Sequence, residues 1–125
     1  WSDIDMYQHV NHATMVTILE EARVPFLADA FGPTITTTGL LIAEVKVSYK
    51  GQLRLVDSPL QVTIWVNRLR AVDFTLGYEV RSVNADPDSR PAVIGETQLA
   101  AFDIDEQRLV RLSPEHREYL QRFVR

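Results

Sequence analysis

Residues 1–31 read WSDIDMYQHVNHATMVTILEEARVPFLADAF and divide into a polar run and an apolar periodic segment. The polar run carries two carboxylates (Asp3 and Asp5), two imidazoles (His9 and His12) and the amide Asn11. Asn11 stands where a helix N-cap is expected, so the run is predicted to be the loop that leads into a helix. Ionisable groups are thereby gathered beside a helix N-terminus, where free N–H groups and the helix dipole favour developing negative charge.

The segment after this loop is predicted to be one long helix that begins at Asn11 or His12 and ends near Ala30. Its apolar stripe is formed by Met15, Leu19, Ala22 and Phe26. Pro25 lacks the N–H that would bond to the Glu21 carbonyl, which predicts a kink or a break near Val24. Gly32 and Pro33 follow as a stop signal.

The rest of the chain is mostly strand-like, with alternating apolar and polar residues. Four strands are predicted, at 41–49, 60–68, 72–83 and 91–103, and a second helix at 113–125. The short link after the second strand favours antiparallel pairing. We therefore predict a single α+β domain over residues 1–125, with one helix packed on an antiparallel sheet. A further strand is expected upstream of Trp1.

Composition excludes several classes of function. The 125 residues carry a net charge of −4, which argues against nucleic acid as a partner because phosphate binding needs a basic face. The chain has no cysteine, so thiolate catalysis and disulfides are excluded, and a cytoplasmic location is expected. No apolar run is long enough for a membrane span, and no membrane partner is expected.

The motifs D-I-D-M-Y-Q-H-V-N-H (residues 3–12) and L-E-E-A-R (residues 19–23) resemble the hotdog-fold acyl-CoA thioesterases of the 4-hydroxybenzoyl-CoA thioesterase type. The resemblance is sharp over the first quarter of the chain. Met15 and Ile18 stand where this family often has tyrosines, and Asp73 stands where a Ser or Thr commonly precedes the aromatic residue Phe74.

This resemblance implies a hotdog fold, a long central helix wrapped by a curled antiparallel sheet. It also implies a homodimer or a dimer of dimers whose sheets join edge to edge, with active sites at the subunit interface. Asp5 matches the catalytic carboxylate of the family. The thioester carbonyl is implied to lie at the helix N-terminus, with a backbone N–H near His12 as its donor.

Thioester hydrolysis needs a carboxylate that either deprotonates water or itself attacks the carbonyl carbon. It also needs a hydrogen-bond donor for the oxyanion that develops on the carbonyl oxygen. Asp5 is the candidate base or nucleophile, and the sequence leaves these two roles open. His9 is a candidate for tuning Asp5 or for orienting water, and equally for a structural role. Asn11 is a candidate helix cap, a role compatible with a substrate contact, and His12 is expected to contribute mainly through its backbone. No cofactor is called for.

Candidate contacts to an acyl-CoA substrate come from both parts of the sequence. The apolar candidates for an acyl pocket, for which ordinary core packing is the alternative, are Val10, Met15, Leu19 and Phe74. Coenzyme A carries phosphates, for which Arg68 and Arg70 are candidate partners, with ordinary surface charges as the alternative. Three roles are open for Glu20 and Glu21: they lie on a solvated helix face, they form an ion pair with Arg23, or one of them is the catalytic base.

Three other readings stay open. Asp3, Asp5, His9 and His12 are all metal-ligand types, which allows a metal site, although our prediction is that no metal is bound. A non-catalytic module that binds acyl-CoA or acyl-carrier protein is the second. A hotdog hydratase or dehydratase is the third, and its products would distinguish it from a thioesterase.

Overall fold

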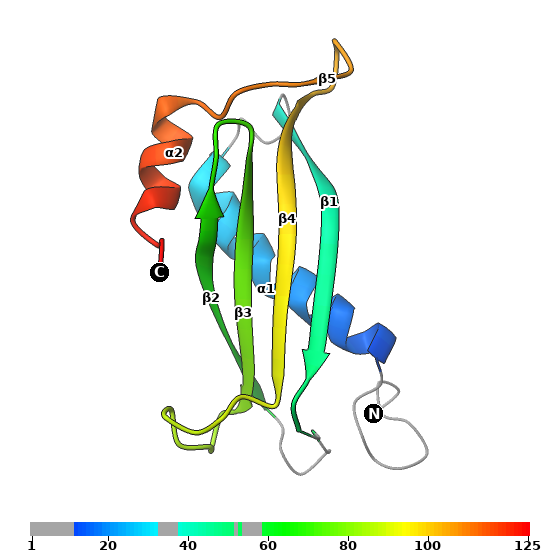
Figure 1. The fold of residues 1–125 in the computed structure, drawn as a ribbon, viewed down its shortest axis with the longest axis vertical. Coiled ribbons are helices and arrows are strands. Elements are labelled where there is room, and N and C mark those ends of the chain that lie inside the picture. The colour runs from blue at the N-terminus through cyan, green and yellow to red at the C-terminus, as the bar shows by residue number, and fades with distance from the viewer. Residues whose placement is uncertain (1–11, 33–37, 52, 54–58) are drawn as a thin grey trace.

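The computed structural model describes residues 12–32, 38–51, 53 and 59–125, and its elements are drawn in Figure 1. The helices are α1 (His12–Phe31) and α2 (Pro114–Gln121). The strands are β1 (Thr38–Tyr49), β2 (Leu60–Leu69), β3 (Asp73–Ser82), β4 (Val93–Asp103) and the short β5 (Arg108–Leu109). The predicted long helix, four strands and C-terminal helix are confirmed, while β5 was not predicted.

The strands form one antiparallel sheet in the order β1-β4-β3-β2, with β5 added to β4. The neighbouring strands β2 and β3 pair directly, as their short link predicted. Strand β1 lies at one edge and pairs only with β4 among the described residues. The other edge, β2, meets the end of the chain, where the Val66 N–H donates to the Phe123 carbonyl at 2.8 Å and the Arg125 N–H to the Val66 carbonyl at 3.1 Å.

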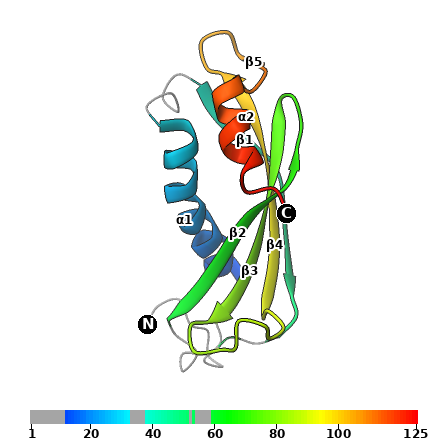
Figure 2. The same ribbon diagram turned by 90° about the vertical axis from the view of Figure 1, so that its left-hand side faces the viewer.

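Helix α1 covers one face of this sheet, and α2 lies beside the C-terminal half of α1 (Figure 2). The core between them is apolar because alternate strand residues face the helix. Four of them on β3 are 0% exposed: Phe74, Leu76, Tyr78 and Val80. Gly95 on β4 permits close approach of α1, since an added Cβ would lie 2.9 Å from Leu19 Cδ1. The observed helix-on-sheet arrangement confirms the predicted α+β class.

Two details of α1 differ from the prediction. The helix continues through Pro25 without the break that was one of the two predicted outcomes, and the kink stays a prediction. Both Pro25 and Glu21 are exposed, so water can bond to the carbonyl that loses its partner. The buried stripe is Met15, Leu19, Arg23 and Leu27, while Ala22 and Phe26 are half-buried. Residues four apart rotate by about 40° per step around the helix, and the twisted sheet beneath α1 accommodates this drift.

The second helix is shorter than predicted and ends at Gln121. Ser113 is its N-cap, as expected, and accepts a hydrogen bond from the His116 N–H at 3.1 Å. Leu120 is buried, but Phe123 and Val124 lie beyond the helix and are 39% and 41% exposed. Their backbone instead extends along β2, where Val66 and Val124 form a parallel bridge.

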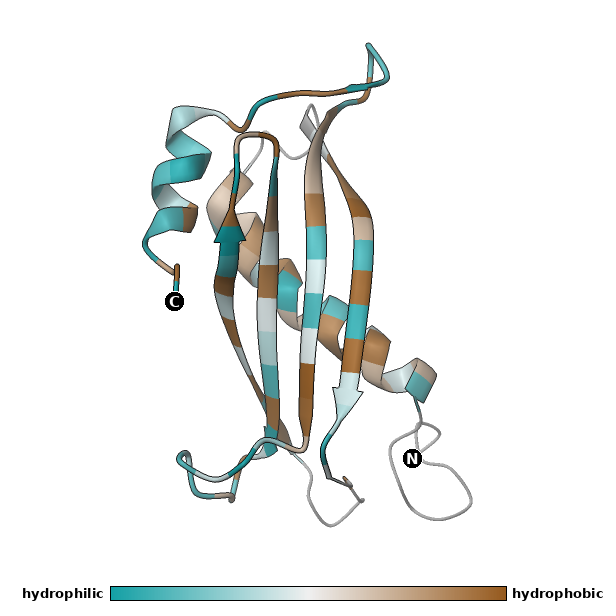
Figure 3. Ribbon diagram, in the orientation of Figure 1, coloured by the Kyte–Doolittle hydropathy of each residue, from teal (hydrophilic) through white to brown (hydrophobic). Residues whose placement is uncertain are grey.

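Hydropathy along the strands reflects two different faces of the sheet. Teal and brown residues alternate along β1 in Figure 3, as the sequence predicted for this strand.

Within the described residues, neither helix combines the length and apolar character that crossing a bilayer needs.

Candidate active site

The predicted loop residues Asp5, His9, Val10 and Asn11 lie outside the described residues. The described part of the site begins at His12, the first residue of α1, which is exposed. The amides of the first helical turn have no partners inside the helix, so this end is suited to holding negative charge. The start of α1 lies near the end of β1 in Figure 1, which brings the helix N-terminus to the open edge of the sheet.

A side-chain contact joins these two elements. The hydroxyl of Tyr49, the last residue of β1, is hydrogen-bonded to Nδ1 of His12 and lies 3.5 Å from the His12 carbonyl oxygen. The two rings meet edge to face with centroids 5.5 Å apart. Partial burial raises the pKa of Tyr49 above its usual value of 10.0, so the hydroxyl keeps its proton at neutral pH.

The edge strand carries uncovered apolar side chains from this contact toward the other end of β1. Ile42, Val45 and Tyr49 are 51%, 42% and 46% exposed. Their pairing with β4 residues Leu99, Thr97 and Val93, which are all buried, puts them on the side of the sheet that α1 occupies. An apolar surface therefore runs along β1 away from the helix N-terminus.

Three predicted acyl-pocket residues are core residues in the structure. Met15, Leu19 and Phe74 are 1%, 2% and 0% exposed. Met15 and Leu19 follow His12 on the first two turns of α1, whereas Phe74 stacks on Phe31 near the other end of the helix, with ring centroids 5.9 Å apart. Their burial matches core packing, the alternative considered from the sequence, and a contact with an acyl chain stays a prediction.

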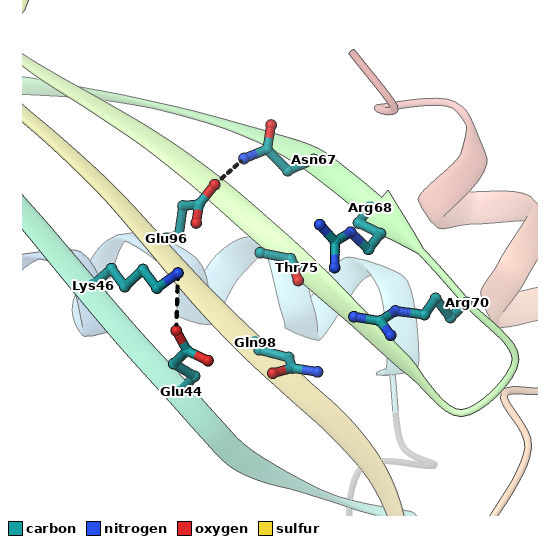
Figure 4. Close-up of a pocket in the computed structure, with 8 residues that line it drawn as sticks. All are labelled: Glu44, Lys46, Asn67, Arg68, Arg70, Thr75, Glu96 and Gln98. Atoms are coloured by element: carbon teal, nitrogen blue, oxygen red, sulfur yellow. Dashed lines mark hydrogen bonds and ion pairs between the residues drawn. The ribbon is translucent and has the colours of Figure 1, made fainter.

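Arg68 and Arg70 line a pocket of about 220 Å³ on the sheet face opposite α1 (Figure 4). Both guanidinium groups point into it beside Thr75. The remaining lining side chains are polar or charged: Glu44, Lys46, Asn67, Glu96 and Gln98. This polarity suits phosphates or sugars, not an acyl chain.

The charges in this pocket are unequally compensated. Lys46 pairs with Glu44 at 3.1 Å, and Arg70 pairs with Asp73 at 3.3 Å. Glu96 accepts from Asn67 at 2.6 Å. Within the described residues, no ion pair joins Arg68 to a carboxylate. Arg68 therefore offers the guanidinium in this pocket that is most available to an anion.

The helix carboxylates Glu20 and Glu21 are both exposed. Arg23, the expected ion-pair partner, is only 6% exposed, and among the described residues neither glutamate pairs with it. The solvated helix face is thus the arrangement found for both. No cluster of three metal-ligand side chains occurs in the described ranges, which exclude Asp3, Asp5 and His9.

Sequence reasoning missed several residues of these sites. Tyr49 was expected only as part of a strand face, because nothing local links it to His12, which is 37 positions away. The pocket contributions of Thr75, Glu96 and Gln98 depend on strand register, since Thr75 pairs with both Arg68 and Gln98. Alternation within a single strand does not determine this alignment between strands.

Comparison with known proteins identifies the family. The family model of the thioesterase-like superfamily matches residues 1–120, and the chain therefore belongs to this superfamily. A curated relative, the long-chain acyl-CoA thioesterase FadM of Escherichia coli (strain K12), is 26% identical over 125 residues. The match covers 98% of this chain and 92% of FadM.

Solved structures agree with this assignment at the level of the fold. A predicted thioesterase from Bacillus stearothermophilus superposes with a TM-score of 0.83 at 19% identity, over 99% of this chain and 90% of that one. The YbaW probable thioesterase from Escherichia coli gives a TM-score of 0.77 at 23% identity, over 99% and 92%. The predicted hotdog fold is confirmed.

Proposed function

We propose that this chain hydrolyses an acyl-CoA thioester to the free acid and coenzyme A at the N-terminus of α1. The observation that carries the proposal is the position of that N-terminus. It is exposed and faces the end of edge strand β1, whose uncovered apolar side chains offer a surface for an acyl chain. Family membership and the acyl-CoA substrate named for FadM support the same reaction.

In this proposal Asp5 is the general base or nucleophile, as in the 4-hydroxybenzoyl-CoA thioesterase type that the sequence resembles. The backbone N–H groups at the start of α1, beginning with His12, hold the carbonyl oxygen as it gains charge. His9 tunes Asp5 or orients water, and Asn11 caps the helix. A thioester needs no metal or cofactor for this chemistry, and the cysteine-free chain is proposed to act in the cytoplasm.

The acyl chain is proposed to lie along β1 over Ile42 and Val45, which are exposed on the side facing α1. Val10, Met15 and Leu19 are proposed to back this surface from the helix side. Phe74 is the weakest of the earlier candidates, because it is fully buried against Phe31.

The outer pocket is proposed to bind the phosphates of coenzyme A through Arg68 and Arg70. Within one chain this pocket is distant from the helix N-terminus. Glu44, which lines the pocket, and Tyr49 are separated by about 17 Å along β1, at about 3.4 Å per residue. Antiparallel pairing of two β1 edges reverses one strand relative to the other, so a second copy shortens the part of this separation that runs along the strand.

We therefore propose a homodimer, or a dimer of dimers, joined along β1. A twofold axis through this edge brings the helix N-terminus of one copy toward the pocket end of the other. The edge has the features that such pairing needs: β1 is a 12-residue strand with one open side among the described residues, and Leu41, Ile42 and Val45 are 45%, 51% and 42% exposed.

The experiment is a thiol-release screen over short, long and aromatic acyl-CoAs, with Asp5→Asn as the matched variant. The wild type is expected to release coenzyme A from at least one class, and long chains are the first to try. Asp5→Asn is expected to keep the fold and lose about 10²–10⁴-fold in kcat. Near-full activity of this variant would refute the role of Asp5, and an acyl chain that is hydrated or dehydrated without thiol release would refute hydrolysis.

A further inference from the structure

Two hydrogen bonds in series cross the outer face of the sheet, from Trp65 through Asn67 to Glu96. The Trp65 Nε1–H donates to Asn67 Oδ1 at 2.7 Å, and Asn67 Nδ2 donates to Glu96 Oε1 at 2.6 Å, the bond drawn in Figure 4. An indole N–H can only donate and a carboxylate can only accept. The Asn67 amide must therefore turn its oxygen to Trp65 and its NH₂ group to Glu96, so the direction of both bonds is fixed.

Trp65, where this series begins, is itself held by two contacts. An added Cβ at Gly77 would lie 2.5 Å from Cε2 of the indole, so the ring lies directly over Gly77 and needs a residue without a side chain there. The Arg125 guanidinium lies 4.4 Å from the centre of the Trp65 ring and 3.6 Å from the Glu79 carboxylate. The Glu96 carboxylate is thus oriented by side chains that the sheet holds in place.

Glu96 puts a fixed negative charge into a pocket whose arginines suit an anion. Asn67 bonds to one of its oxygens, and among the described residues the other oxygen accepts no hydrogen bond and joins no ion pair. A carboxylate would repel a ligand that offered only a phosphate. The ligand that fits both groups carries an anion for Arg68 and a hydrogen-bond donor, such as a hydroxyl, for Glu96.

We propose that Glu96 is a specificity-determining residue, which accepts a hydrogen bond from a ribose hydroxyl of the substrate while Arg68 binds the phosphate on the same ribose. This inference rests on the proposed function and deepens it, because it names the part of coenzyme A that the outer pocket holds. The volume of about 220 Å³ is smaller than the roughly 300–1,000 Å³ of sites that enclose a whole small molecule, and it suits one sugar phosphate.

The assignment also separates two carriers of an acyl group. Coenzyme A presents a phosphorylated ribose with a free hydroxyl, whereas acyl-carrier protein presents its thioester on pantetheine phosphate without a ribose. Glu96 therefore favours coenzyme A thioesters. Acyl-CoA is expected to have a KM about tenfold lower than that of the matching acyl-pantetheine phosphate.

The binding test uses two probes that differ by one hydroxyl, adenosine 3′,5′-bisphosphate and its 2′-deoxy analogue, in calorimetric titrations. The wild type is expected to bind the first about tenfold more tightly, because the hydroxyl bonds to a charged acceptor. Glu96→Gln is expected to lose this preference, since Asn67 engages the amide oxygen and leaves an NH₂ group, which cannot accept. Glu118→Gln on α2, an exposed glutamate outside the pocket, is the control and should keep the preference.

A second variant tests the role of Trp65 as a positioning residue. Trp65→Phe keeps an aromatic ring over Gly77 but removes the N–H that orients Asn67, so the preference is expected to fall by about threefold. Adding Trp65→Phe to Glu96→Gln is expected to change the ratio of the two affinities no further. A further change in the double variant would show that Trp65 acts independently of Glu96, contrary to the inference.

These titrations do not depend on hydrolysis, so they separate the inference from the proposed function. Equal affinities of the wild type for the two probes, no binding of either, or a preference retained in Glu96→Gln would overturn the inference, even in an active thioesterase. A wild type that shows the preference and loses it in Glu96→Gln, yet releases no thiol from any acyl-CoA, would refute hydrolysis and uphold the binding role of Glu96.

Discussion

The two ends of α1 differ sharply in how they are held. At the C-terminal end Phe31 stacks on Phe74 and contacts the His116 ring, with centroids 4.3 Å apart, and Leu27 and Ala30 are buried. At the N-terminal end His12 and Ala13 are exposed, and Tyr49 supplies a polar link to the sheet. One end of the helix is anchored in the core, while the other begins with exposed residues at an open edge of the sheet. This difference separates the part of the fold that provides stability from the part proposed to carry chemistry.

The anchored end should tolerate little truncation. Leu120 on α2 is fully buried, and Leu120→Ala is expected to lower the free energy of unfolding by about 2–5 kcal/mol. Because Leu120 is remote from the start of α1, kcat of the folded variant should be unchanged below its melting temperature. Urea unfolding and thiol release on the same sample measure both effects. A large fall in kcat of fully folded Leu120→Ala would contradict the separation of stability at one end of α1 from catalysis at the other.

Activity at the N-terminal end of α1 should depend on a second copy of the chain. Val45→Lys puts a charge on the helix side of β1, and we expect the dimer dissociation constant to rise by at least about tenfold, because an unpaired charge is costly to bury. Thiol release should fall with the loss of dimer. Ser48→Lys, on the opposite face of the same strand, is the control. Light scattering after size-exclusion chromatography measures the assembly, and unchanged dimers in Val45→Lys would contradict pairing along β1.

The outer pocket should affect binding more than rate. Arg68→Gln removes the guanidinium that lacks a carboxylate partner among the described residues, and KM for acyl-CoA is expected to rise about tenfold with kcat unchanged. The same variant should behave like the wild type with an acyl-pantetheine substrate, which has no nucleotide phosphates. An equal rise in KM for both substrates would show that Arg68 does not act by binding the nucleotide phosphates.

Acid sensitivity should come partly from the anchored end. Burial lowers the pKa of His116 from its usual 6.5, an effect larger than the opposing influence of Glu115. The folded protein therefore binds this proton less readily than the unfolded chain, so stability is full above about pH 6.5 and declines as the pH falls toward the folded pKa. His116→Gln should show a shallower decline between pH 7.5 and pH 5 in urea unfolding. Glu118→Gln, on the exposed side of α2, serves as the control.

The fold was predictable from sequence because local residue patterns determine most of its helices and strands. Alternation gave the four main strands, helical spacing gave α1, and Ser113 followed by Pro114 gave the start of α2. Pro25 does not break α1, and whether a proline breaks a helix depends on the surroundings of the carbonyl it leaves unpaired, here Glu21, which only the tertiary structure determines. Phe123 and Val124 are exposed because the chain leaves the helix before them and Val124 forms a bridge with Val66, which is far away in sequence.

The candidate site was predictable only in part. Ionisable residues before a helix pointed to its N-terminus, and the family resemblance to Asp5, but the contact of His12 with Tyr49 joins residues on elements whose packing no local pattern records. Arg68 and Arg70 share a pocket because a register shift between Val66 and Arg68 brings both to the outer face. Such a β-bulge has no reliable sequence signature.

The most direct test of the central claim is amide NMR of the protein during titration with a non-hydrolysable acyl-CoA analogue. If the thioester carbonyl binds at the start of α1, the backbone amides of His12, Ala13 and Thr14 should show the largest shifts, together with Tyr49. Saturable binding that leaves these amides unmoved and shifts others instead would contradict the account.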